Sequence, residues 1–359
     1  MSGQMQAVQA QARTARRSRV RSYLRFIVAV VYFFLARSLA QRGAEGLVTE
    51  AWTPLVSQAM LVFLLLLGYA AMGFWLDGQT LPVSEQGLPV RRGWSREAGL
   101  GMAVGWAAAV ACVLPMALAG GIAIVLFLTP SAWGWLAADA AYFALWALVE
   151  EMVFRGYGFQ RFADAVGPAG ATLGFAAFYA IVESERQGAN TATFFVSLVL
   201  ALVLTMAYLR TRALWVSWGI NFGWKASRAL LFGLTVSGVN SRSPVVEGNP
   251  MGSFWLTGGG YGLDGSWLAF LVLLVALPVV YRATRDLDYR YNAPVLVPAG
   301  IPVDLDAAAR QQHEAAMGPS EPVLVQIGAL GNGSQTAAAA HGTAEAGHDV
   351  PAEPETGAQ

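Results

Sequence analysis

The chain has very few of the side chains that soluble enzymes use for chemistry. Its 359 residues include one cysteine and three histidines, and only 13% of them are charged, which is roughly half the charged fraction of a typical soluble domain. The single cysteine, Cys112, excludes an internal disulfide. The histidines, His313, His341 and His348, all lie in the polar C-terminal segment. The apolar region before it therefore has no imidazole to hold a metal or accept a proton.

Charge is balanced as well as scarce. The 23 basic and 23 acidic residues give a formal net charge of zero, so no overall field attracts nucleic acid or acidic partners. Lys225 is the only lysine. Hydrophobic residues make up 55% of the chain, and several runs are long enough to cross a bilayer. The composition predicts an integral membrane protein, with the lipid bilayer as a partner and no nucleic-acid partner.

The apolar runs predict an all-α, polytopic membrane helix bundle of about eight transmembrane helices. The predicted spans are residues 23–40, 55–76, 99–128, 132–153, 168–182, 193–209, 214–234 and 266–281. The first could instead be a signal peptide, but Arg37 interrupts it and more spans follow. The third exceeds one span, so we expect it to be tilted, kinked at Pro115 or partly re-entrant. Arginines on alternate connections predict that both termini are cytoplasmic, and we expect a bacterial inner membrane.

The chain divides into a basic cytoplasmic arm (1–25), a transmembrane domain (26–283) and a C-terminal tail (284–359). The tail is rich in Ala, Gly, Pro and acidic residues and lacks periodicity, so we expect it to be largely disordered. Residues 235–264 are predicted to form an external loop, in which Asp264 is expected to cap the last helix.

Two adjacent glutamates, Glu150 and Glu151, stand at the end of the fourth predicted span, and Arg155 follows. On a helix, Glu151 and Arg155 are i,i+4 neighbours in the favourable order, while Glu150 points about 100° away. Carboxylates in a membrane are costly, which makes them functional candidates. The alternative is a helix-end ion pair that orients the helix, with Glu150 solvated at the interface.

The seventh predicted span carries a second polar group. Asn221 and Lys225 are i,i+4 neighbours, and Ser217 lies one turn earlier. A polar stripe on an otherwise apolar helix should face the bundle interior or a cavity.

These features together resemble the CPBP family, the CAAX prenyl protease and bacteriocin-processing group of intramembrane proteases. Glu150, Glu151 and Arg155 match the family motif EExxxR, and the sequences YLRTRALW (208–215), FGW (222–224) and TGG (257–259) follow in the family's order. The resemblance covers about residues 80–280. It implies an intramembrane endopeptidase that acts on a membrane-associated peptide or protein, with a glutamate-activated water attacking the peptide bond. Descriptions of the family differ on whether a metal takes part.

The chain departs from the family at its histidines. In the second motif, FxxxH, the histidine position is taken by Val182, Glu183 or Tyr179, depending on the register. In the third motif, HxxxN, Asn221 replaces the histidine and Lys225 replaces the asparagine. Catalytic metals usually need about three protein ligands, commonly including histidine. We therefore expect neither a metal nor another cofactor.

The role of Lys225 remains open between two main interpretations. In one, Lys225 pairs with Glu150 or Glu151, makes the carboxylate a poorer base, and leaves a pseudoprotease that serves as a membrane scaffold or binding protein. In the other, Glu150 is the base, Glu151 and Arg155 support it, and Asn221 and Lys225 stabilise the oxyanion. A third, less favoured possibility is that Lys225 snorkels to the external interface.

Overall fold

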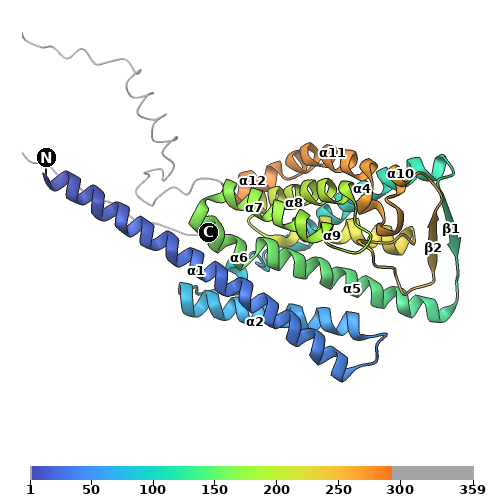
Figure 1. Cartoon of the computed structure of the whole chain (residues 1–359), viewed down its shortest axis with the longest axis horizontal. Helices are drawn as coiled ribbons and strands as arrows, with labels where there is room; N and C mark the ends of the chain where they lie inside the picture. Colours follow the sequence, from blue (N-terminus) through green and yellow to red (C-terminus); the bar gives the residue numbers. More distant parts are fainter. Residues whose placement is uncertain (1, 293–359) are drawn as a thin grey trace, which may run out of the picture. The chain divides into compact units, whose positions relative to one another are not determined.

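The computed structural model describes residues 2–292, and side chains over 18–288. Within this range almost every element is a helix (Figure 1). A helix corresponds to each predicted span: α1 (Ser2–Leu47), α2 (Thr53–Asp77), α4 (Trp94–Leu118), α5 (Pro130–Arg155), α7 (Pro168–Ser184), α8 (Thr191–Thr211), α9 (Leu214–Ala226) and α11 (Trp267–Ala283). The all-α membrane bundle is confirmed.

The helices differ in how well their length suits a bilayer. Five stretches in the described part of the chain are long and apolar enough to cross a membrane: Ser18–Leu47, Thr53–Asp77, Trp94–Leu118, Pro130–Val166 and Thr191–Thr211. Helix α11 is apolar but shorter. Helices α7 and α9 have 17 and 13 residues, and α9 continues as the π-helical turn η1 (Ser227–Leu231).

Short elements connect these helices. They are α3 (Pro82–Glu85), α6 (Tyr157–Val166), α10 (Phe254–Thr257), η2 (Gly259–Tyr261), η3 (Leu263–Gly265) and α12 (Arg285–Asn292). The predicted tail beyond α12 lies outside the described residues.

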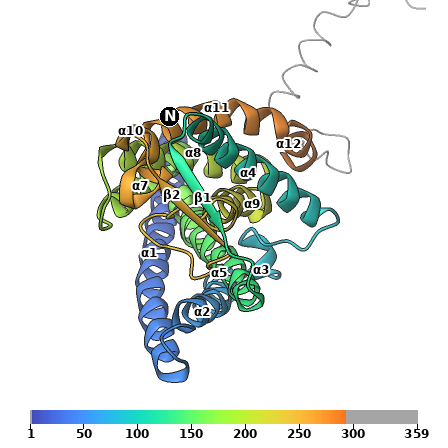
Figure 2. The same ribbon diagram turned by 90° about the vertical axis from the view of Figure 1, so that its right-hand side faces the viewer.

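The expectation of one tilted, kinked or partly re-entrant span over residues 99–128 was wrong, because the run divides into a helix and a strand. Helix α4 ends at Leu118, shortly after Pro115, and Gly120 then adopts a left-handed φ of 69°. The following strand β1 (Ile122–Leu126) pairs antiparallel with β2 (Val246–Pro250), and the ribbon crosses one end of the bundle (Figure 2). An apolar run does not by itself distinguish helix from strand, whereas β-branched residues favour the strand.

The expected cap of the last helix was also wrong. Ser266, not Asp264, is the N-cap of α11, and its Oγ accepts a hydrogen bond from the amide of Ala269 at 3.1 Å. Asp264 instead faces inward and bonds residues of α9 and η1. A buried arginine competes for the carboxylate more strongly than a helix end does.

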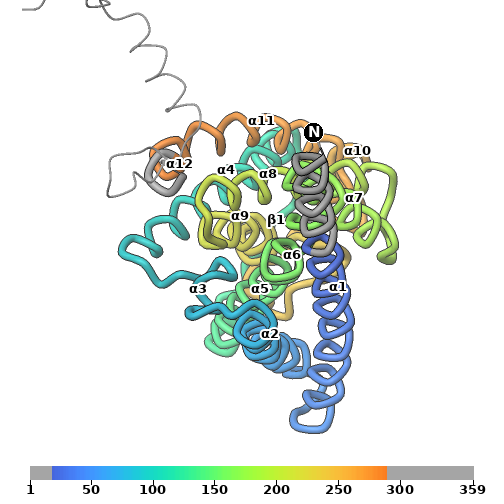
Figure 3. The backbone as a smooth tube through the Cα atoms, turned by 90° about the vertical axis from the view of Figure 1, so that its left-hand side faces the viewer, coloured from blue at the N-terminus to red at the C-terminus, as the bar shows by residue number. Residues whose placement is uncertain are grey.

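Helix α9 lies against α4, α5 and α8 (Figure 3). Glycines at four-residue spacing let the backbones of α4 and α9 touch: Gly101 and Gly105 on α4, and Gly219 and Gly223 on α9. A Cβ atom on Gly101 would lie 2.2 Å from the carbonyl oxygen of Val216. Small residues of this kind allow close helix packing in lipid. The contact fixes the rotation of α9, and therefore the direction of its polar stripe.

On the opposite side, α1 and α2 pack together, with α1 against α6 and α2 against α5. Arg25 and Arg161 both form ion pairs with Asp77 at the end of α2. Nearby, the rings of Phe26 and Phe162 lie 4.8 Å apart, centroid to centroid. These contacts join α1, α2 and α6 at one end of the bundle.

Candidate functional site

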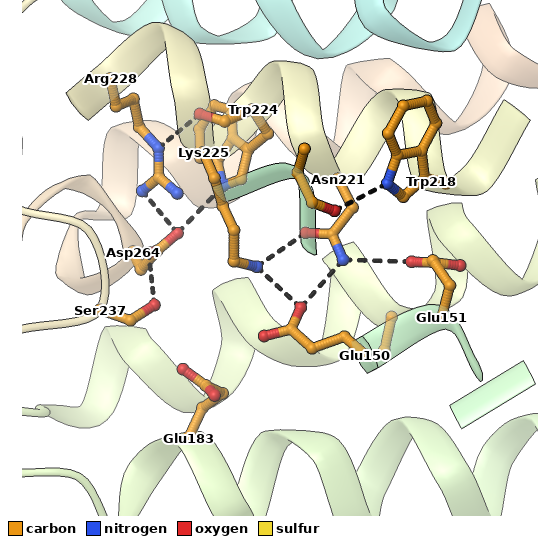
Figure 4. A network of polar contacts seen from close by, with 12 residues as sticks. Glu150, Glu151, Glu183, Trp218, Asn221, Trp224, Lys225, Arg228, Ser237 and Asp264 are labelled. Atoms are coloured by element: carbon orange, nitrogen blue, oxygen red, sulfur yellow. Dashed lines mark hydrogen bonds and ion pairs between the residues drawn. The ribbon is translucent and has the colours of Figure 1, made fainter. Parts of the chain in front are cut away.

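The two polar groups predicted from the sequence meet between α5 and α9 (Figure 4). The ammonium Nζ of Lys225 lies 2.8 Å from Oε2 of Glu150 and also donates to Oδ1 of Asn221 at 2.7 Å. The amide Nδ2 of Asn221 donates to Oε2 of Glu150 at 2.9 Å and to Oε1 of Glu151 at 3.1 Å. Asn221 thus bridges both glutamates, and Lys225 pairs with Glu150. The contact removes the snorkelling alternative.

Glu151 and Arg155 form the predicted i,i+4 ion pair. Nη1 of Arg155 lies 3.0 Å from Oε1 of Glu151. The same guanidinium donates to the hydroxyl of Thr205 at 3.3 Å and to the carbonyl of Ala201 at 3.4 Å, both on α8. Oε2 of Glu151 has no hydrogen-bond partner among the described residues. The ion pair therefore joins two successive turns of α5, and Arg155 also links α5 to α8.

The whole network is withdrawn from solvent. Glu151 and Asn221 are 0% exposed, Lys225 is 2% exposed and Glu150 is 7% exposed. A buried charge without a partner costs several kcal/mol, so each of these ions depends on the opposite charge beside it. Glu150 has Lys225 as its cation and Glu151 has Arg155, which leaves this part of the interior neutral.

A second buried ion pair lies one turn further along the same helix. The η1 turn places Arg228 with Nη1 2.7 Å from Oδ1 of Asp264. Asp264 also accepts from the indole of Trp224 and from the hydroxyl of Ser237, each at 3.0 Å. Burial alone would raise the pKa of Asp264, but Arg228 beside it holds that pKa below its usual range. Sequence reasoning missed this pair, whose only signal was Arg228 standing three residues after Lys225.

A cavity of about 690 Å³ opens beside Glu150, lined mainly by residues of α1, α2, α5, α6 and α7. Tyr179, Val182 and Glu183, the three candidates for the second-motif histidine, all line it. Glu183 is already paired, because Arg186 lies 2.9 Å from one carboxylate oxygen and the Tyr261 hydroxyl donates to the other at 2.8 Å. The second-motif positions therefore lie at the cavity, whereas Asn221 and Lys225 of the third motif contact Glu150 without lining it.

The donor set does not fit a catalytic metal. The nearest candidate ligands are Glu150 and Glu151, which already bond Lys225 and Arg155. No group of three or more His, Cys, Asp or Glu side chains with metal-binding geometry occurs in the described part of the chain. A divalent ion would have to displace two cations and would find no imidazole ligand within residues 18–288.

The fold and this site define a helical membrane protein with a buried ion-pair network beside an apolar cavity. Residues 132–227 match the family model described as Type II CAAX prenyl endopeptidase Rce1-like. The resemblance to the CPBP family is thereby confirmed over the segment that carries Glu150, Glu151, Arg155, Asn221 and Lys225. No curated protein matches, and no solved structure matches.

Proposed function

We propose that this chain is a pseudoprotease of the CAAX protease-like type, a membrane protein that keeps the protease layout but binds a partner without hydrolysing it. One observation carries the proposal: the 2.8 Å contact between Nζ of Lys225 and Oε2 of Glu150. Lys225 stands at the motif's asparagine position, and the histidine position before it holds Asn221.

The chemistry of the contact supports this proposal. A general base needs a free lone pair directed at the water that it activates. Oε2 of Glu150 already accepts from both Lys225 and Asn221, and an adjacent ammonium stabilises the ionised carboxylate, which makes it a weaker base. Asn221 can neither accept a proton nor transfer one. The network holds α5, α8 and α9 together, and we assign it a structural role.

The second candidate is an intramembrane endopeptidase that uses no histidine. It is favoured by a different observation, because Glu150 lines the cavity and its other oxygen, Oε1, has no hydrogen-bond partner among the described residues. A water bound there could be activated by Glu150, with Asn221 and Lys225 stabilising the oxyanion. Glu151 and Arg155 would then hold Glu150 in position. The substrate would be a membrane-associated peptide or protein.

A peptidase assay with three forms of the full chain separates the two functions. Wild type, Glu150→Gln and the motif-restoring variant Val182→His/Asn221→His/Lys225→Asn are placed in liposomes with labelled membrane-associated peptides. We expect wild type and Glu150→Gln to show the same background, and the restored variant to exceed it. Hydrolysis by wild type would reject the pseudoprotease. Its loss in both Glu150→Gln and the less destabilised double variant Glu150→Gln/Lys225→Met, but not in the exposed control Glu50→Gln, would establish the endopeptidase.

We further propose that both termini are cytoplasmic in a bacterial inner membrane. Support comes from the arginines, which gather on alternate connections. Arg25 and Arg161 also pair with the same residue, Asp77, at one end of the bundle. The N-terminal arm and the connection after α5 must therefore lie on the same side of the membrane. Membrane-impermeant thiol labelling of cysteines introduced at positions 3 and 290 should succeed only from the cytoplasmic side.

A further inference from the structure

The cavity beside Glu150 is apolar along most of its length. Its walls include Ile27, Phe34, Phe154, Phe175 and Phe178. Phe34 and Phe178 are more than half exposed, and they stand on α1 and α7, which both border the cavity. Helix α6 packs against both α1 and α7, so the cavity is closed at that end while its apolar side chains remain accessible between α1 and α7. The walls therefore suit an aliphatic chain that enters from the lipid.

The charges of the cavity do not cancel within the described residues. Glu150 is compensated by Lys225, and Glu183 is compensated by Arg186. Arg37 on α1 also lines the cavity, yet among the described residues no carboxylate or hydrogen-bond acceptor pairs with it. Arg37 is thus one positive charge without a matching negative charge.

Arg37 lies near one end of the apolar part of α1. It follows Arg25 by twelve residues, or about 18 Å at 1.5 Å per residue. The predicted first span ends at residue 40, and the polar residues Gln41 and Arg42 follow. A guanidinium that borders an apolar cavity at the end of a span is stabilised by an anion or a hydrogen-bonding partner.

We propose that this cavity binds a single-chain anionic amphiphile, with its aliphatic chain among the phenylalanines and its carboxylate or phosphate monoester on Arg37. The amide of Gln58, whose Oε1 is buried without a partner among the described residues, lines the same cavity. It offers a hydrogen bond to a protonated or hydroxylated headgroup. The inference concerns this end of the cavity and does not rest on whether Glu150 hydrolyses peptides.

An amphiphile fits the cavity better than an extended peptide. Apart from Arg186 and Val239, the wall residues come from helices, whose backbone groups already bond one another. The backbone of Val239 is paired with that of Val236. A peptide backbone in this apolar space would leave N–H and C=O groups unpaired, each at a cost of several kcal/mol. An aliphatic chain carries no such groups and needs only one polar contact.

The route from water also favours a lipid-borne ligand. A second, more polar cavity adjoins the first and shares Gln41, Ser57, Gln58 and Tyr142 with it. Glu45 and Glu50 line this second cavity. Two carboxylates would repel an anion that approached from that side, so the anion arrives from between α1 and α7.

The test measures saturable binding of tritiated palmitate and of hexadecyl phosphate to the full chain in phosphatidylcholine nanodiscs. Hexadecanol serves as the neutral probe, and a hydrophobic peptide with a free C-terminal carboxylate as the peptide probe. The variants are Arg37→Gln, Arg37→Lys and the matched control Arg42→Gln, an exposed arginine on the same helix that does not line the cavity. Arg37 is itself exposed, so its substitution leaves folding intact.

We expect one or both anionic probes to bind wild type and Arg42→Gln saturably. Arg37→Gln should weaken this binding by at least about tenfold, the effect of losing a charged hydrogen bond, and Arg37→Lys should restore part of it. Preference for palmitate or for hexadecyl phosphate identifies the headgroup. Equal binding to Arg37→Gln, equal binding of hexadecanol, or binding of the peptide alone would overturn the proposal. Peptidase activity of the wild-type chain would reject the pseudoprotease, but it would not change the binding results expected here.

Discussion

Removing either partner of the Glu150–Lys225 pair should destabilise the protein far more than removing both. The 2.8 Å contact is almost fully buried. Lys225→Met leaves Glu150 as an unpaired buried carboxylate, and Glu150→Gln leaves Lys225 as an unpaired buried ammonium. Breaking a buried pair in this way costs about 3–5 kcal/mol, whereas replacing both charges with neutral groups of similar volume is often close to neutral.

We therefore expect each single variant to lose about 3 kcal/mol or more of unfolding free energy. The double variant Glu150→Gln/Lys225→Met should lose less than either single variant, because no charge is then left unpaired. Asn221 remains in all three variants and can still bond Gln at position 150. The coupling energy, taken from the full cycle, should reach the upper part of the usual range of about 0.5–3 kcal/mol, or exceed it.

The assay is equilibrium unfolding by sodium dodecyl sulfate in mixed micelles, followed by circular dichroism. Arg96→Met is the matched control, because Arg96 is exposed and its loss should change stability by no more than about 0.5 kcal/mol. If Lys225→Met matched this control, or if the single losses simply added in the double variant, the buried ion pair would not be a structural element and the reasoning behind the pseudoprotease would fail.

Three further predictions concern the elements around the site. Gly219→Ala should cost about 1–3 kcal/mol, because its Cβ would lie 2.2 Å from a carbonyl oxygen of α4, while Gly99→Ala, which meets nothing within 4 Å, should be neutral or slightly stabilising in the same unfolding assay. Because the pKa of Asp264 is lowered in the fold, its pairing with Arg228 stabilises the protein above the ordinary aspartate pKa of about 3.9 and is lost as the pH falls through the lower folded value. The acid-induced loss measured by circular dichroism should therefore be smaller in Asp264→Asn than in wild type, and an unchanged acid profile would contradict the assignment. Ser266→Ala should lower the unfolding free energy by about 1 kcal/mol, because α11 loses its N-cap. A thermal melt can detect this change, and a loss below about 0.3 kcal/mol would refute the prediction.

Local sequence spacing was enough to predict part of the site. Glu151 and Arg155 stand four residues apart on one helix, so their contact depends only on helix geometry, and it is present at 3.0 Å. Asn221 and Lys225 share the same spacing and lie within 2.7 Å of each other. The helix positions followed from apolar runs for the same reason, because a span in lipid must satisfy its own backbone.

Spacing could not decide features that depend on distant segments. The run after Pro115 is apolar whether it forms a helix or a strand, and it became β1 because β2, more than a hundred residues later, pairs with it. The partner of Asp264 was likewise unpredictable, since Arg228 reaches it only after the 235–264 loop folds back over α9. Both errors arose where a local signal was compatible with two structures.

Sequence alone was enough to identify a helical membrane protein with an EExxxR motif, and to show that its two altered motifs contain no histidine. It left open whether Lys225 meets Glu150, Glu151 or the membrane interface, because residues 75 positions apart come together only through packing. Tertiary structure made that choice, since the backbone contact between α4 and α9 at Gly219 and Gly223 allows one rotation of α9. Packing of α1 against α2 and α6 likewise brought Arg37 to the cavity with no acceptor paired to it among the described residues, which no local pattern could have predicted.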